Sequence, residues 1–132
     1  MFNVIFRREM RKSDTAIMSN EQFEIVIPVR NLDSCRAFYR GLLGLGNPVF
    51  DSNFQVEFQL DNRATLILQK ITDGQDGQAK VPEWQFRVEK PEELSKLLHS
   101  YGFRIEALNR RNTFRCLDPE NNPFIILNQT DA

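Results

Sequence analysis

The feature that most constrains the fold is an internal repeat. EIVIPVR at 24–30 lies over EWQFRVE at 83–89, and apolar and polar residues alternate in the same phase in both. Such alternation is typical of a strand that buries one face. Each copy is followed by a helix-like segment and then by three strand-like segments, so the chain contains the same unit twice. Neither unit can bury its sheet face alone, and we therefore expect the two to pack together.

The first unit has clear signals for its helix. NLDSCRAFYRGLLG carries an apolar stripe at helical spacing, Asn31 or Asp33 can cap its start, and Gly44 and Gly46 end it. The three strands of this unit are predicted at 48–51, 54–60 and 64–70.

The second unit follows a loop at 71–82 that is rich in Gly, Asp and Gln and is typical of a linker. KPEELSKLLHSYG predicts a helix, because Pro91 lies near its first turn and Gly102 follows it. One strand is predicted before this helix and three after it, at 83–88, 103–108, 113–117 and 124–127.

These elements predict an α+β fold in which two βαβββ modules form one curved mixed sheet around a concave cavity, with the helices outside. The modules span about 22–70 and 83–128, within a single domain at 22–130. Residues 1–21 are predicted to form a weakly packed N-terminal arm. The alternative is that Phe2, Val4 and Phe6 dock onto a sheet edge, which could belong to a second subunit.

Composition and charge exclude several classes of protein. The chain is 41% hydrophobic and 27% charged, and its net charge of -1 creates no field that favours nucleic acid or an anionic membrane. Its apolar runs are far shorter than the roughly 18 residues that span a bilayer. MFNVIFRREMRKSD places its charges after a short apolar patch, which is the wrong order for a secretory signal. We therefore expect a cytoplasmic protein with no nucleic-acid or membrane partner.

The alternation also predicts which side chains face the cavity. The apolar phase of each first strand must lie under the helices, because helices need an apolar sheet to pack on. The other phase then faces the concave side, with Glu24 and Val26 from the first unit and Glu83, Gln85 and Arg87 from the second.

Two stretches on this doubled layout resemble the vicinal oxygen chelate superfamily, which includes glyoxalase I, extradiol dioxygenases, and fosfomycin and bleomycin resistance proteins. VRNLDSCRAFYRGLLGL resembles the family pattern V-x-D-L-x-x-S-x-x-F-Y-x-x-x-L-G-L, with Asn31 in place of Asp. LDPENNPFIIL resembles its D-P-D-G-N-x-x-E turn and strand. The resemblance covers about residues 22–128.

The resemblance implies where a metal would lie in metal-using members, which hold the ion with four inward side chains, usually His and Glu. These positions correspond to Glu24, Glu83, Ile125, and either Ile67 or Gln69. Isoleucine donates nothing to a metal, so we expect no metal and no cofactor. The only histidine, His99, lies on the second helix and is expected on the surface.

A polar ligand site is the sharper interpretation of the inward polar residues, since ligand pockets combine apolar walls with a few convergent polar groups. The alternative is that the glutamates lie at a wet cavity mouth or pair with arginines. No arrangement of Ser, His and Asp or of Cys and His is available, so we assign no catalytic residue. The predicted ligand-binding residues are Glu24, Glu83, Gln85, Arg87, Gln69 and Arg115.

Three functions remain open on the sequence. The first is a metal-independent small-molecule-binding protein similar to bleomycin resistance proteins, homodimeric as its relatives often are, with no enzymatic activity. The second is an enzyme of the same superfamily, a lyase, isomerase or dioxygenase with an atypical metal site. The third is an interaction module that uses only the sheet surface.

Overall fold

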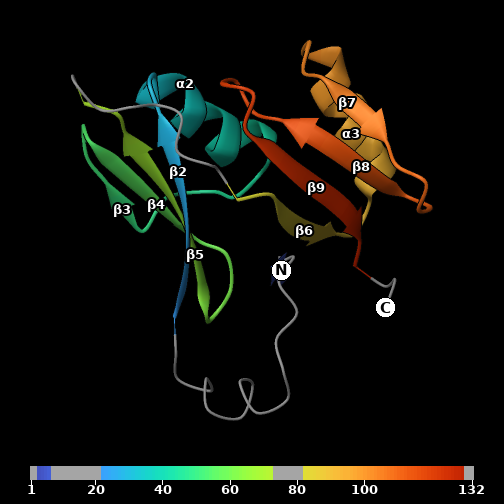
Figure 1. Cartoon of the computed structure of the whole chain (residues 1–132), viewed down its shortest axis with the longest axis horizontal. Helices are drawn as coiled ribbons and strands as arrows, with labels where there is room; N and C mark the ends of the chain where they lie inside the picture. The colour runs from blue at the N-terminus through green and yellow to red at the C-terminus, as the bar shows by residue number, and fades with distance from the viewer. Residues whose placement is uncertain (1–2, 7–21, 73–81, 130–132) are drawn as a thin grey trace.

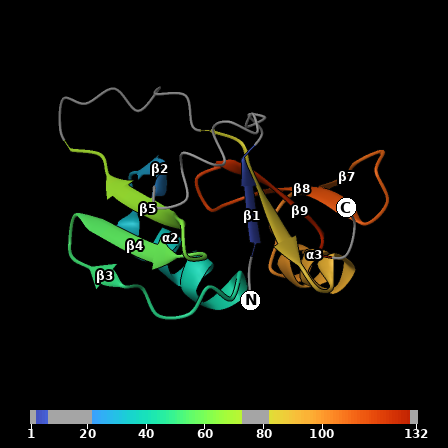
Figure 2. The same cartoon turned by 90° about the horizontal axis from the view of Figure 1, so that it is seen from below.

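The computed structural model describes residues 3–6, 22–72 and 82–129. The first module contains β2 (Phe23–Val29), α2 (Leu32–Ala37), a π-helix η1 (Phe38–Leu42), β3 (Phe50–Asp51), β4 (Gln55–Gln59) and β5 (Ala64–Lys70). The second contains β6 (Trp84–Val88), α3 (Pro91–Ser100), β7 (Ile105–Ala107), β8 (Thr113–Leu117) and β9 (Pro123–Asn128). The two βαβββ modules lie side by side, each with its own helix (Figures 1 and 2).

Both modules have the same strand order, which confirms the repeat. The first sheet runs β2-β5-β4-β3, and the corresponding strands of the second run β6-β9-β8-β7. In each sheet the first strand pairs in parallel with the last, and the remaining pairs are antiparallel. None of the helices in the described ranges is long and apolar enough to cross a membrane.

The strands form two hydrogen-bonded sheets rather than the single continuous sheet that we expected. Within the described residues no strand pairing joins β2 to β6. The edge of β6 that faces the first module is instead taken by β1 (Asn3–Phe6), which pairs with it in antiparallel orientation (Figure 2). The sequence left open that the N-terminal segment docks onto a sheet edge. The structure shows this pairing for residues 3–6, on a sheet edge of the same chain. The described residues do not include Phe2, the remainder of the arm at 7–21, or the linker residues 73–81.

The first helix changes type half-way. Asn31 caps α2, because its side chain accepts a hydrogen bond from the backbone N–H of Ser34 at 3.1 Å. At Phe38 the backbone hydrogen bonding changes to that of a π-helix, in which an N–H bonds to the carbonyl five residues earlier. The N–H of Leu43, for example, donates to the carbonyl of Phe38 at 2.9 Å. The wider π turn accompanies the burial of two consecutive aromatic residues, Phe38 and Tyr39, which are 2% and 0% exposed.

One hydrophobic cluster includes side chains from both modules. At its centre the ring of Phe38 lies 4.8 Å from that of Phe103 and 6.1 Å from that of Phe124. Phe124 also stacks on Trp84 at 5.5 Å. Helix η1 of the first module therefore packs directly on aromatic rings of the second.

The polar turn between β8 and β9 binds the first module. Asp118 is 2% exposed, and one of its carboxylate oxygens accepts a 2.8 Å hydrogen bond from the hydroxyl of Tyr39. The carboxylate of Glu120 accepts hydrogen bonds from the backbone N–H groups of Arg30 and Asn31, each at 2.7 Å. These groups lie at the start of α2, where N–H groups have no partner within the helix. The turn therefore connects the modules as well as leading into β9.

Candidate functional site

The predicted site residues of the second module come together on the sheet face opposite the helix. Gln85 on β6 pairs with Ile125 on β9, and Ile125 pairs with Arg115 on β8. These three side chains form a row across the sheet, because directly paired residues point to the same face. The row has a buried apolar centre, Ile125 at 3% exposure, and half-buried polar ends.

Glu83 and Arg115 form an ion pair beside this row. The distance from Nε of Arg115 to Oε2 of Glu83 is 3.0 Å, and Nη1 of Arg115 lies 3.9 Å from Glu106. Nη1 of Arg87 donates to the backbone carbonyl of Asn128 at 3.1 Å. The alternative in which Glu83 pairs with an arginine is therefore present in the structure, and the pair fixes the direction of both side chains.

In the first module Glu24 and Gln69 share a face but lie apart. Glu24 pairs with Thr65, whereas Gln69 pairs with Pro28, which is four residues further along β2. At the usual rise of a strand this separates the two side chains by about 13 Å. Both are exposed, so this module does not bring them to one point.

Two residues of β4 belong to the same face and were not among the predicted site residues. Gln55 pairs with Gln69, and Glu57 pairs with Ile67. The side-chain amide of Gln55 donates to the carboxylate of Glu57 at 2.8 Å. The alternation of β4 was a visible signal for them, because Gln55, Glu57 and Gln59 form its polar phase.

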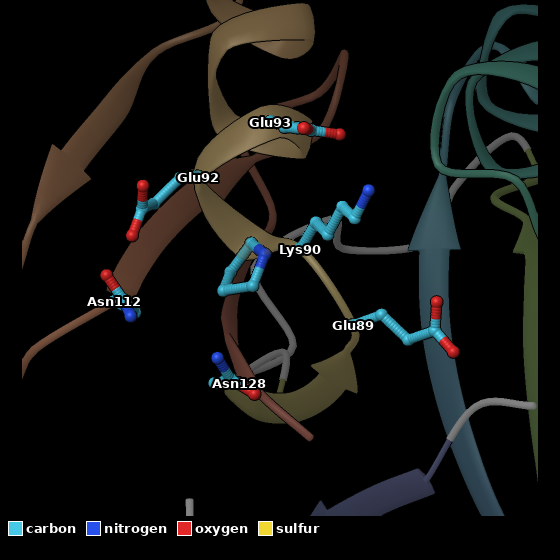
Figure 3. Close-up of a pocket in the computed structure, with 7 residues that line it drawn as sticks. Glu89, Lys90, Glu92, Glu93, Asn112 and Asn128 are labelled. Carbon is cyan, nitrogen blue, oxygen red and sulfur yellow. The ribbon is translucent and has the colours of Figure 1, made fainter. Parts of the chain in front are cut away.

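A pocket of about 180 Å³ lies at the start of α3 (Figure 3), and most of the residues that line it are charged or amide residues. Its three carboxylates point in different directions, with Glu89 directed away from Glu92, so they do not converge on one cation. The lining residues are Glu89, Lys90, Pro91, Glu92, Glu93, Asn112 and Asn128.

The buried thiols and the buried tyrosine stay protonated at neutral pH. Burial raises the pKa of Cys116 to about 12. Burial, followed by the nearby carboxylates of Asp118 and Glu120, raises the pKa of Cys35. Burial and then Asp118 raise the pKa of Tyr39. Because the thiolate is the reactive form, burial disfavours both cysteines as nucleophiles.

Comparison with known proteins yields solved structures but no match in sequence. No protein-family model matches the chain, and no curated protein matches it. A lactoylglutathione lyase from Agrobacterium tumefaciens has a TM-score of 0.64 and 18% identity, over 81% of this chain and 92% of that one. The bleomycin resistance determinant of transposon Tn5 has a TM-score of 0.61 and 23% identity, over 83% and 99%. A fosfomycin resistance protein from Listeria monocytogenes, in complex with Mn(II) and sulfate, has a TM-score of 0.61 and 14% identity, over 83% and 89%.

The chain has the fold of the vicinal oxygen chelate superfamily. The resemblance predicted from the two sequence stretches is thereby confirmed at the level of fold. The structures that share this vicinal oxygen chelate fold include a lyase and two resistance proteins, so the fold alone does not decide between catalysis and binding.

Strand register decides which residue of β5 corresponds to Ile125 in this vicinal oxygen chelate fold. Ile125 pairs with Gln85, and Ile67 pairs with Val26. Residues 26 and 85 are equivalent in the repeat, so the corresponding position is Ile67 and not Gln69.

The residues at these positions do not fit a transition-metal site. Ile67 and Ile125 are 6% and 3% exposed and have no donor atom. Glu83 is held by Arg115, and Glu24 lies on a strand that is not paired with β6. Across residues 3–6, 22–72 and 82–129, no three His, Cys, Asp or Glu side chains are grouped closely enough to hold a metal ion. A tight zinc-type site needs three or four such ligands.

Proposed function

We propose that the chain is a small-molecule-binding protein of the glyoxalase and bleomycin resistance type, and that binding needs no metal. The observation that carries this proposal is the pair of buried isoleucines, Ile67 and Ile125, at corresponding inward positions of the two modules. They place apolar side chains where a metal-using relative would need donor atoms. Gln85, Arg87 and Arg115 flank Ile125 with hydrogen-bond donors, as in ordinary ligand sites.

The charges suggest that the two modules contact different parts of the ligand. On this face the first module presents Glu24 and Glu57, together with glutamines. The second presents Arg87 and Arg115, with Arg115 partly neutralised by Glu83. A ligand with both donor and acceptor groups around an apolar body would match this distribution.

A thermal-shift panel in the presence of EDTA tests the proposal. The panel contains aromatic, cationic and oxyanion compounds, and a true ligand should raise the melting temperature without any metal. Ligand at about 100 times its Kd stabilises the native state by roughly 2.7 kcal/mol, which for a chain of this size raises the melting temperature by roughly 10 °C. Failure of every compound to shift the melting temperature would contradict the proposal.

Matched variants assign any binding to the proposed face. Arg87→Gln and Arg115→Gln remove a charge from the face, whereas Arg40→Gln removes a charge from the exposed surface of η1. The first two variants should reduce the ligand-induced shift, and Arg40→Gln should leave it unchanged. Equal shifts in all three variants would place the ligand elsewhere.

The superfamily also supports a second candidate, an enzyme with an atypical metal site. It rests on one of the neighbours being a lyase and another containing Mn(II). In this chain Glu24 and Glu83 would be the first ligands of such a metal.

We also propose a homodimer. The β3–β4 region exposes three large apolar side chains, Val49, Phe50 and Phe54, at 63%, 50% and 65%. A sheet edge with exposed aromatic residues is commonly covered by a partner. Sedimentation should give a dimer that Phe50→Ser combined with Phe54→Ser converts to monomer. A monomer throughout the micromolar range for the unmodified chain would contradict the proposal.

A further inference from the structure

We infer that the groove between α3 and the β7–β8 hairpin is a second binding site, which takes an amphiphilic anion such as an aryl carboxylate. The groove has a volume of about 310 Å³ and lies on the helix side of the second sheet, opposite the row of Gln85, Ile125 and Arg115. It is therefore independent of the proposed function. Its lining residues are Ser95, Lys96, His99, Ile105, Ala107 and Phe114.

The internal repeat explains why this space is open. The offset that superimposes the first strands also superimposes the helices, and it places Ser95 at the position of Arg36. In the first module Nε of Arg36 lies 3.0 Å from the carboxylate of Asp51, and its Nη2 donates to the carbonyl of Ser52 at 3.0 Å. The long side chain of Arg36 thus fills the space between helix and edge strand. Ser95 cannot fill the same space, and its hydroxyl turns back to the carbonyl of Glu92 at 2.8 Å.

The edge strand of the second module, β7, has no acidic residue at the position that corresponds to Asp51. Asp51 pairs with Val56 in the first module, and Ala107 pairs with Phe114 in the second. Val56 and Phe114 are equivalent, because they pair with corresponding residues of the last strands, Leu68 and Ile126. Alanine therefore stands where the first module has Asp51.

Burial of the sheet agrees with this comparison. Val56 is fully buried under the first helix, whereas Phe114 at the equivalent position is only half-buried. In the first module the ion pair of Arg36 and Asp51 occupies this volume. In the second module the smaller residues Ser95 and Ala107 leave it open as the groove.

The lining of the groove selects an anion with an apolar body. Ile105 and Phe114 provide an apolar wall, and Lys96 and His99 provide two nitrogen donors on α3. Within the part of the chain that the structure describes, neither of these two side chains has an ion-pair or hydrogen-bond partner. Glu106 lies on β7 between Ile105 and Ala107, but its side chain faces the other side of the sheet, toward Arg115. Among the described residues, no acidic one therefore lines the groove. A ligand carboxylate beside Lys96 would supply the negative charge that Asp51 supplies in the first module.

The size of the groove fits a small ligand. Ligand pockets in proteins start at about 300 Å³ and combine apolar walls with a few polar groups. A phenyl ring against Phe114, joined by a short chain to a carboxylate beside Lys96, has this form.

Titration with 4-phenylbutyrate tests the inference, with uncharged 4-phenylbutyramide as the matched compound. The carboxylate should bind saturably with one molecule per chain and shift the backbone amide NMR signals of α3, β7 and β8. The amide should bind about fivefold to tenfold more weakly, as expected when an ionic contact to the exposed Lys96 and a hydrogen bond from His99 are lost.

Two variants provide the decisive comparison. Ser95→Arg combined with Ala107→Asp grafts the bridge of the first module into the groove, and it should abolish binding without lowering the melting temperature. Lys96→Gln combined with His99→Gln changes only exposed side chains, and it should reduce carboxylate affinity to that of the amide. Arg40→Gln, on the exposed surface of η1 in the first module, should have no effect. No saturable binding in the millimolar range, or binding that both double variants leave unchanged, would overturn the inference.

Discussion

Replacing Asp118 with alanine is expected to lower the free energy of unfolding by about 4 kcal/mol. Its carboxylate accepts four hydrogen bonds in a buried position, from the hydroxyl of Tyr39, the backbone N–H groups of Glu120 and Asn122, and the side-chain amide of Asn122. Alanine would leave these donors without a partner, and each unsatisfied buried donor costs about 1–3 kcal/mol. Urea unfolding followed by the fluorescence of Trp84, the only tryptophan, measures the change.

The matched variant is Tyr39→Phe, which removes only the hydrogen bond from Tyr39 to Asp118 and leaves the bonds of Glu120 to the first module in place. It should cost about 1–2 kcal/mol, clearly less than Asp118→Ala. A loss below about 1 kcal/mol for Asp118→Ala would mean that water replaces the carboxylate, and the turn would then not connect the modules in the way described.

Replacing Phe124 with alanine is expected to cost about 3–5 kcal/mol. Its ring is fully buried and contacts aromatic residues of both modules, Trp84 at 5.5 Å and Tyr39 at 6.4 Å. The cavity would open at the contact between the modules, where neither sheet can move inward without losing other contacts. Urea unfolding gives the free energy, and near-UV circular dichroism reports whether the remaining rings keep their packing.

Tyr101→Ala is the control for this substitution, because Tyr101 is 64% exposed at the C-terminal end of α3. Its effect should stay within about 0.5 kcal/mol. If Phe124→Ala were equally mild, the aromatic cluster would not be the common core of the two modules.

The repeat made most of the fold predictable from the sequence. Apolar and polar residues alternate in 24–30 and 83–89 because one side of each strand is buried, and this alternation can be seen in the sequence itself. The pairing of β1 with β6 could not be predicted in the same way, because it joins segments that are far apart in sequence. The π turn at Phe38 was also not predicted, since it depends on packing against rings of the second module.

The site was predictable in part. The sequence predicted Gln85 and Arg115 as ligand-binding residues, and the register of β6, β9 and β8 brings them to the two sides of Ile125. It left Ile67 and Gln69 as alternatives, because residues two apart on a strand share a face and only the pairing separates them. The ion pair of Glu83 was an open alternative that required side-chain positions to resolve.

The turn at 117–123 shows a limit of interpretation from motifs. The motif D-P-D-G-N-x-x-E suggested a turn that directs an inward carboxylate, yet Ile125 occupies that place. The carboxylates that matter structurally lie in the turn itself, where Asp118 and Glu120 bind the first module. Their partners in the first module lie at least 79 residues away in sequence, so no local pattern indicates this connection.

Metal content is the most direct test of metal-independent binding. The protein is purified without chelator, analysed for bound metals, and then titrated with Mn²⁺, Fe²⁺, Ni²⁺ and Zn²⁺. The proposal predicts no stoichiometric transition metal and no activity upon addition, because Ile67 and Ile125 provide no donor and Glu83 is paired with Arg115. One bound ion per chain that is lost in Glu24→Gln or Glu83→Gln would contradict the proposal and make the enzyme the better account.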